Sequence, residues 1–149
     1  MPYQQTAPPC VVRLVARRGL AFATLAQLAQ SQALRQEAGR LWTELVALPT
    51  PARAKGRWHS ASDLEQATKG GQSALHSQSV PARCQKFAAN VETATELRRQ
   101  EVAETGHLQT QYPQHAKAYQ TVIWKDQALS VVPAGYLRLP TGGQRPPLL

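Results

Sequence analysis

The loop from Ala52 to Ser60, which reads ARAKGRWHS, holds the densest set of side chains suited to binding a ligand. Arg53, Lys55 and Arg57 are basic, and Trp58 follows them directly. Basic side chains bind phosphates and an indole offers a face on which a base can stack, so the pattern is typical of nucleic-acid binding. A tryptophan in such a loop is more often a plug over a helical core, and both roles stay open.

The remaining reactive residue types do not form a recognisable catalytic or metal site. The histidines are scattered, without HxxxH or HExxH spacing, and lie at His59, His76, His107 and His115. Cys10 and Cys84 form no CxxC pair, so we expect reduced thiols. The glycine pairs at 70–71 and 142–143 lack the spacing of a phosphate-binding loop. No two acids are placed so as to suggest a general acid and base. We therefore expect neither a cofactor nor a complete enzyme active site.

The charge of the chain is high and unevenly placed. The 149 residues carry a formal net charge of +8. Residues 1–58 hold eight Lys or Arg against two acids, residues 59–110 five against six, and residues 111–149 four against one. A basic face of this kind attracts polyphosphate, because each neutralised phosphate releases counterions. A chain that is basic only for solubility is the alternative.

A β-sheet is the first element that the sequence predicts to position these charges. Runs 121–125, 128–132 and 136–139 are rich in β-branched and aromatic residues and are separated by turn sequences, which predicts an antiparallel meander. The outer edge of a meander needs cover, and the other strand-like run is 10–15, far upstream. We therefore predict an α+β fold, a small antiparallel β-barrel built from both chain ends with a helical bundle inserted between them.

Hydrophobic spacing predicts three helices in that insertion. The first spans 20–48 and ends at the prolines that follow, and whether it breaks near Ser31 stays open; its apolar stripe is Leu34, Ala38, Leu41, Leu45 and Leu48. A capping box from Ser62 to Glu65 opens a short helix that stops at Gly70. A helix of about 25 residues, with Pro81 in its first turn or at a kink, runs to Gly106; its stripe is Val80, Cys84, Phe87, Val91 and Ala94.

The chain then divides into four parts. We expect residues 1–9, which are rich in proline, to be a disordered lead-in, and 10–19 to form the first barrel strand. Residues 20–111 form the helical insertion and 112–149 supply the remaining barrel strands. The sequence has no run of 18 apolar residues and no signal peptide, so a cytoplasmic protein without a membrane partner is expected.

Several phrases, in their order and spacing, resemble the N-terminal region of TnpB, the OrfB-type transposases of insertion sequences. They are LWTEL at 41–45, GRWHS at 56–60, LHSQSV at 75–80, the stretch 112–125 and GYLRL at 135–139. The family is related to type V CRISPR nucleases. The resemblance implies an N-terminal strand, a helical recognition lobe and a wedge-type β-barrel. In the family a RuvC nuclease domain and a zinc ribbon follow; this sequence has no counterpart of their acids and cysteines, so we expect no nuclease activity from it.

The resemblance also implies that the chain grips a guide RNA and target DNA. It assigns phosphate contacts to Arg13, Arg17, Arg18, Arg53, Lys55, Arg57, Lys125, Arg138 and Arg145, and nucleotide contacts to His76, Gln78 and Tyr119. Pro81 departs from the family pattern and leaves the reach of Gln78 open. The leading hypothesis is thus a nucleic-acid-binding part of a mobile-element protein, which could act with a separately encoded RuvC-like nuclease. The alternative is a helical protein-interaction domain whose basic charge is incidental.

Overall fold

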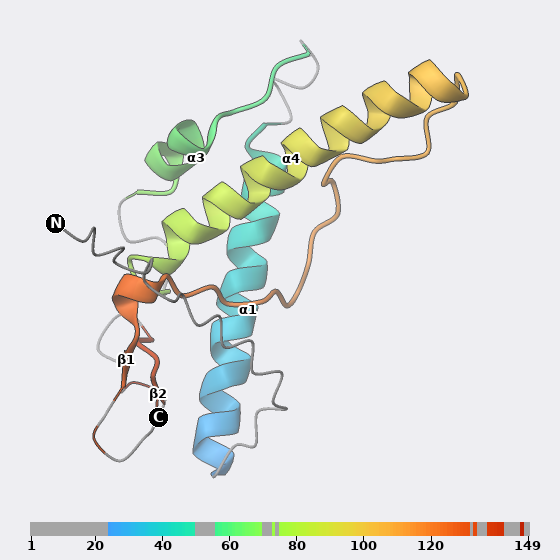
Figure 1. The fold of residues 1–149 in the computed structure, drawn as a ribbon. Helices are drawn as coiled ribbons and strands as arrows, with labels where there is room; N and C mark the ends of the chain where they lie inside the picture. Colours follow the sequence, from blue (N-terminus) through green and yellow to red (C-terminus); the bar gives the residue numbers. More distant parts are fainter. Residues whose placement is uncertain are drawn as a thin grey trace, which may run out of the picture.

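The computed structural model describes residues 24–49, 56–69, 73, 75–131, 133, 137–141 and 147. These form helices α1 (Leu25–Ala47), α3 (Ala61–Ala67) and α4 (Ser79–Glu104), the 3₁₀ turn η1 (Asp126–Ala128), and strands β1 (Ser130–Val131) and β2 (Leu137–Arg138). Figure 1 shows α4 crossing α1, with α3 beside α4. After α4 the chain turns back, runs extended along the two long helices and reaches η1 and the strands (Figure 1).

Helix α1 is continuous from Leu25 to Ala47, so the helix has no break at Ser31. The side chain of Thr24 caps its first turn by accepting a hydrogen bond of 3.1 Å from the backbone N–H of Gln27. The predicted apolar stripe is confirmed, because its first four members are buried and Leu48 is half-buried. Burial of one face fixes the period of the apolar residues, which is why the spacing predicted this helix.

The capping box of α3 lies two residues before the predicted one. The Ser60 side chain accepts a hydrogen bond from the backbone N–H of Asp63, and the Asp63 carboxylate accepts one from the backbone N–H of Ser60 at 2.9 Å. The expected box from Ser62 to Glu65 was wrong, because Ser60 and Asp63 satisfy the same pattern one half-turn earlier. The hydrogen bonds from Ser60 lower the pKa of Asp63.

Helix α4 matches the prediction closely. Pro81 occupies its first turn, where a proline costs no internal hydrogen bond. Beyond the half-buried Val80, the predicted stripe is buried. The helix ends before Gly106, whose φ of 70° belongs to the left-handed conformation that favours glycine at this position.

The core forms where the three helices meet. Its buried members include Leu41, Leu45, Leu64 and Phe87, and the rings of Trp42 and Phe87 meet edge to face with centroids 5.2 Å apart. Half-buried residues from the returning chain pack against this cluster; they are Tyr112, Val122, Trp124 and Leu139. The chain that follows α4 is therefore a layer over the helices.

The predicted β-barrel was wrong. In the part of the chain that the structure describes, the sheet consists of two two-residue strands, with Ser130 opposite Arg138 and Val131 opposite Leu137 in antiparallel register. Residues 121–125, expected as a strand, are extended but pair with none. The side chain of Trp124 instead packs on the helical core, and its Nε1 donates to the carbonyl of Pro140 at 2.6 Å. The expected lead-in and first strand, residues 1–19, lie outside the described residues.

Candidate nucleic-acid interface

Positive charge is concentrated in the segments that the structure leaves undescribed. All nine acids and eleven of the seventeen Lys and Arg residues fall within the described ranges, so these ranges are nearly balanced. The other six basic residues are all predicted phosphate contacts that lie outside the described residues: Arg13, Arg17, Arg18, Arg53, Lys55 and Arg145. No acid accompanies them there, so most of the net charge of +8 belongs to those segments.

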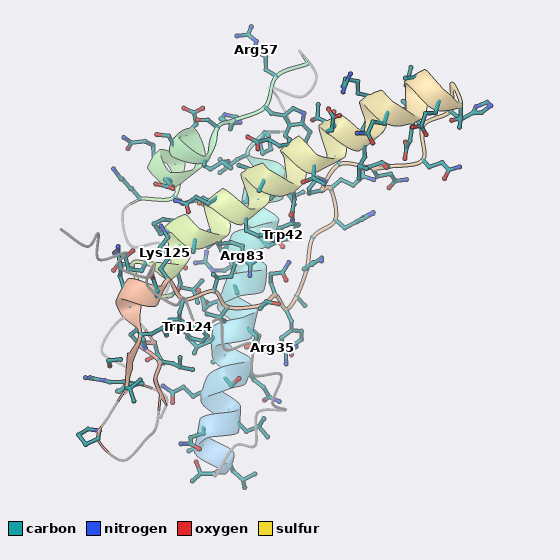
Figure 2. The ribbon with its side chains drawn as sticks, viewed as in Figure 1. Arg35, Trp42, Arg57, Arg83, Trp124 and Lys125 are labelled. Atoms are coloured by element: carbon teal, nitrogen blue, oxygen red, sulfur yellow. The ribbon has the colours of Figure 1, made fainter. Side chains whose placement is uncertain are left out.

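The structure does not gather the described phosphate candidates into one patch. Arg57 is exposed before α3, Lys125 is half-buried at the start of η1, and Arg138 is exposed on β2. Figure 2 shows Arg57 and Lys125 well apart, at the top of the view and beside the first turn of α4. These residues cannot hold one phosphate together, although each can contact a different phosphate along an extended strand.

Trp58 is a plug. Its half-buried ring packs against the helical core, and its centroid lies 4.7 Å from that of Tyr112. The guanidinium of Arg98 lies on the Tyr112 ring, with Cζ 4.9 Å from the centroid, and its Nη1 donates to the carbonyl of Thr110. Because Trp58 and Tyr112 cover each other, we infer that Trp58 fastens the returning chain to the helices.

His76 and Gln78 form the turn that leads into α4. The imidazole Nδ1 of His76 accepts a hydrogen bond of 3.2 Å from the backbone N–H of Gln78, and both residues are half-buried. Gln78 stands at the N-cap but makes no side-chain cap, so its amide is not tied to the helix end. The geometry gives His76 a structural role and leaves the Gln78 side chain open to a ligand.

Tyr119 forms an exposed cluster with α1. Tyr119 is 48% exposed, the Arg35 guanidinium carbon lies 5.7 Å from its ring centroid, and the amide of Gln36 donates to its phenol oxygen at 3.3 Å. An exposed guanidinium beside an aromatic face can hold a phosphate and stack on a base at the same time. Arg35 was not predicted as a site residue. Sequence could not have found it, because the pair is joined only by the fold.

The backbone around Tyr119 is docked tightly on α1. The indole Nε1 of Trp42 donates to the carbonyl of His115 at 3.1 Å, and the backbone N–H of Lys117 donates to Thr43 Oγ1 at 3.1 Å. The backbone N–H of Gln120 donates to the carbonyl of Arg35 at 3.0 Å. Gly39 makes this approach possible, since a Cβ there would lie 2.5 Å from the carbonyl oxygen of Ala118.

A groove of about 480 Å³ lies between α4 and the returning chain. Asn90, Gln111 and Gln114 contribute amide groups to its wall, and Lys117 contributes an ammonium group that also lies 5.3 Å from the Trp42 ring centroid. No Asp or Glu is among its lining residues. The groove can therefore offer amide donors and acceptors and one positive charge to a ligand of nucleotide size.

Glu101 fixes the turn at which the chain reverses after α4. Its carboxylate accepts hydrogen bonds from the backbone N–H groups of Gln109 and Thr110 and from the Thr110 hydroxyl. The Thr110 hydroxyl, followed by these two N–H groups, lowers the pKa of Glu101. On the same helix, Arg99, followed by Gln100, lowers the pKa of Glu96 to about 2. Both acids have a lowered pKa because they bind groups of α4 and of the turn that follows it. A general acid at neutral pH needs a raised pKa, so neither acid suits that role.

The described residues show neither a metal centre nor a membrane span. No group of three or more His, Cys, Asp or Glu side chains within the described ranges could hold a metal ion. In the same ranges, no helix combines the length and the apolar character that crossing a bilayer requires.

No protein-family model, curated protein or solved structure matches the chain. The resemblance to TnpB therefore stays a prediction.

Proposed function

We propose that this chain binds nucleic acid, as the recognition part of a TnpB-like mobile-element protein that grips guide RNA or DNA and has no nuclease site of its own. The observation that carries the proposal is the exposed pair of Arg35 and Tyr119, a cation beside an aromatic face on docked chain. Two further observations support it. The nearby groove has no acidic lining residue, and six of the seventeen basic residues lie in segments that contain no acid.

Binding of a labelled single-stranded oligonucleotide, measured by fluorescence anisotropy over a range of KCl concentrations, tests the proposal. Affinity should fall steeply with salt, with a slope of log K against log salt of about −0.7 for each phosphate contacted. Tyr119→Ala should weaken binding about tenfold, since stacking on one aromatic side chain contributes about 1–3 kcal/mol. Arg35→Gln should also make the slope shallower by about one contact.

Lys69→Gln is the matched control, because it removes one exposed positive charge just beyond α3, outside the two segments that form the Arg35 and Tyr119 pair. It should leave the stacking contribution intact. Absence of binding at low salt would refute the proposal for the whole chain. Binding that Tyr119→Ala and Lys69→Gln weaken equally would refute the assignment to the Arg35 and Tyr119 pair.

A second candidate, the protein-interaction domain, has one observation in its favour. Three apolar side chains at the far end of α4 and its turn are exposed, Leu97 at 43%, Val102 at 53% and Leu108 at 51%. A partner protein, such as a separately encoded RuvC-like nuclease, could cover them. Co-purification with a defined protein, together with indifference to nucleic acid, would favour this function over the first.

A further inference from the structure

Arg83 is a buried cation without a counterion. It lies one turn into α4, and 5% of its surface is exposed. Its Nη2 atom is buried and makes no hydrogen bond. Desolvation by burial lowers the pKa of the guanidinium, and no acid raises it. Arginine rarely sits in this state, because a buried charge is stable only when it is paired.

The hydroxyl of Ser79 is a second unpaired donor in the same place. Ser79 is 2% exposed, and its Oγ is buried without a hydrogen-bond partner. It precedes Arg83 by four residues, so both side chains lie on one face of α4. Helical side chains lean toward the N-terminus, which directs the guanidinium toward the first turn and Ser79. Figure 2 shows Arg83 near the crossing of α4 and α1.

The acids of the chain do not supply the missing charge. All nine lie within the described ranges, and several are already engaged: Glu37 with Arg40, Asp63 with Ser60, Glu65 with Gln85, Glu96 with Arg99, and Glu101 with Thr110. The charged side chains outside the described ranges are all basic. Among the described residues no carboxylate forms a salt bridge with Arg83, and none raises the pKa of its guanidinium.

We propose that Arg83 and Ser79 form a binding site for a phosphate group at the first turn of α4. The occupant is a backbone phosphate of the bound polynucleotide, so this assignment rests on the proposed function. The guanidinium supplies charge and several donors, the hydroxyl supplies one more, and the positive end of the helix dipole adds to both. The long unbranched stem of arginine lets the guanidinium turn toward the entering phosphate. The negative charge of the phosphate then pairs the guanidinium, which removes the free-energy cost of a buried unpaired charge.

Two substitutions on α4 test the site, each removing one positive charge. Arg83→Met removes the buried charge and keeps an unbranched apolar side chain, whereas Lys86→Met removes an exposed charge almost one turn further along. Thermal unfolding in phosphate-free buffer should give Arg83→Met a Tm at or above that of the wild type. A clear fall in Tm would show that Arg83 stabilises the free protein, and would overturn the proposal.

Ligand binding is then measured with two probes. Inorganic phosphate, exchanged for chloride at constant ionic strength, should raise the Tm of the wild type and of Lys86→Met more than that of Arg83→Met. A single-stranded oligonucleotide should bind Arg83→Met about tenfold more weakly than Lys86→Met, as expected for the loss of a charge-assisted phosphate contact. Absence of a phosphate effect on the wild type overturns the site without any variant.

The outcomes separate this site from the proposed function. Oligonucleotide binding that is unaffected by Arg83→Met overturns the polynucleotide assignment and leaves the proposed function standing. If phosphate still stabilises through Arg83 in that case, the occupant is a free anion. Conversely, phosphate stabilisation that depends on Arg83, in a protein that binds no oligonucleotide, supports the anion site and overturns the proposed function.

Discussion

Gly39→Ala is expected to undock the returning chain from α1. The new Cβ would lie 2.5 Å from the carbonyl oxygen of Ala118, 2.6 Å from its carbonyl carbon and 2.7 Å from the carbonyl oxygen of Lys117. Real Cβ atoms essentially never approach other atoms so closely. The obstacles are backbone atoms on a segment held at several points, so a change of side-chain rotamer cannot relieve the clash. The segment must therefore move away.

The size of the effect follows from the contacts that this movement breaks. Three hydrogen bonds of 3.1 Å or shorter hold the segment to α1, from Trp42 to His115, from Lys117 to Thr43 and from Gln120 to Arg35. Each contributes about 1 kcal/mol, so about 3 kcal/mol is lost. Alanine is a better helix former than glycine by up to about 1 kcal/mol, which offsets part of the loss. The net loss is about 2 kcal/mol, or a fall in Tm of about 4–8 °C for a chain of this length.

Urea unfolding followed by circular dichroism measures this difference. Ala29→Gly, at an exposed site on the same helix, is the control, because it isolates the helix propensity term and should cost about 1 kcal/mol. A Gly39→Ala protein as stable as the wild type, or more stable, would refute the reasoning, since propensity alone would then account for the site.

Substitutions at Glu101 and at Trp58 test two further contacts of the returning chain. Glu101 has a lowered pKa in the folded protein, so its contribution to stability is full above the unfolded value of 4.5 and is lost as pH falls through the folded value. Between pH 7 and pH 3 the Tm of Glu101→Gln should therefore fall less than that of the wild type. The control Glu104→Gln, on the same helix, should show the same fall in Tm as the wild type. An equal fall in Tm for both variants would count against the role of Glu101. Trp58→Ala should lose about 2 kcal/mol of stability as a half-buried plug, while Trp58→Phe should keep oligonucleotide affinity unchanged. Loss of affinity in Trp58→Phe without loss of stability would instead make Trp58 a stacking platform.

The helices could be predicted from the sequence because burial of one face imposes a period on the apolar residues. Leu34 and Leu41 on α1, and Cys84 and Phe87 on α4, were all assigned to the core and are all buried. The start of α3 was placed wrongly for a different reason. Two overlapping capping patterns begin at Ser60 and Ser62, and local sequence does not tell which hydroxyl will meet an unpaired backbone N–H.

The prediction of a β-barrel was wrong because residue types indicate an extended, partly buried segment but do not tell which element that segment packs against. Val122 and Trp124 are half-buried as a strand pattern requires, but the surface they cover is a pair of helices. An extended chain docked on helices and a strand docked in a sheet bury the same residue types with similar alternation. The distinguishing feature is where the backbone N–H groups find acceptors. For Gln120 the acceptor is the carbonyl of Arg35 on α1, which lies far away in the sequence.

Most of the candidate interface could not be predicted, because its residues are far apart in the sequence. Tyr119 was predicted as a nucleotide contact, whereas its neighbour Arg35 reads as an ordinary solvated charge on a helix. Arg83 is hidden differently, since an arginine four residues after a serine is common on exposed helical faces. Its burial becomes apparent only in the folded structure, and only then does the missing counterion carry meaning.

Two anchors make the candidate interface a consequence of the fold. Glu101 holds the chain where it leaves α4, and the close approach at Gly39 holds it where it crosses α1. The segment between them lines the groove, and Tyr119 follows directly after the second anchor. Because both ends are tied to helices, the chain can present the phenol ring beside Arg35 before any ligand arrives. A ligand that stacks there does not have to order the segment, so more of the interaction energy remains as affinity.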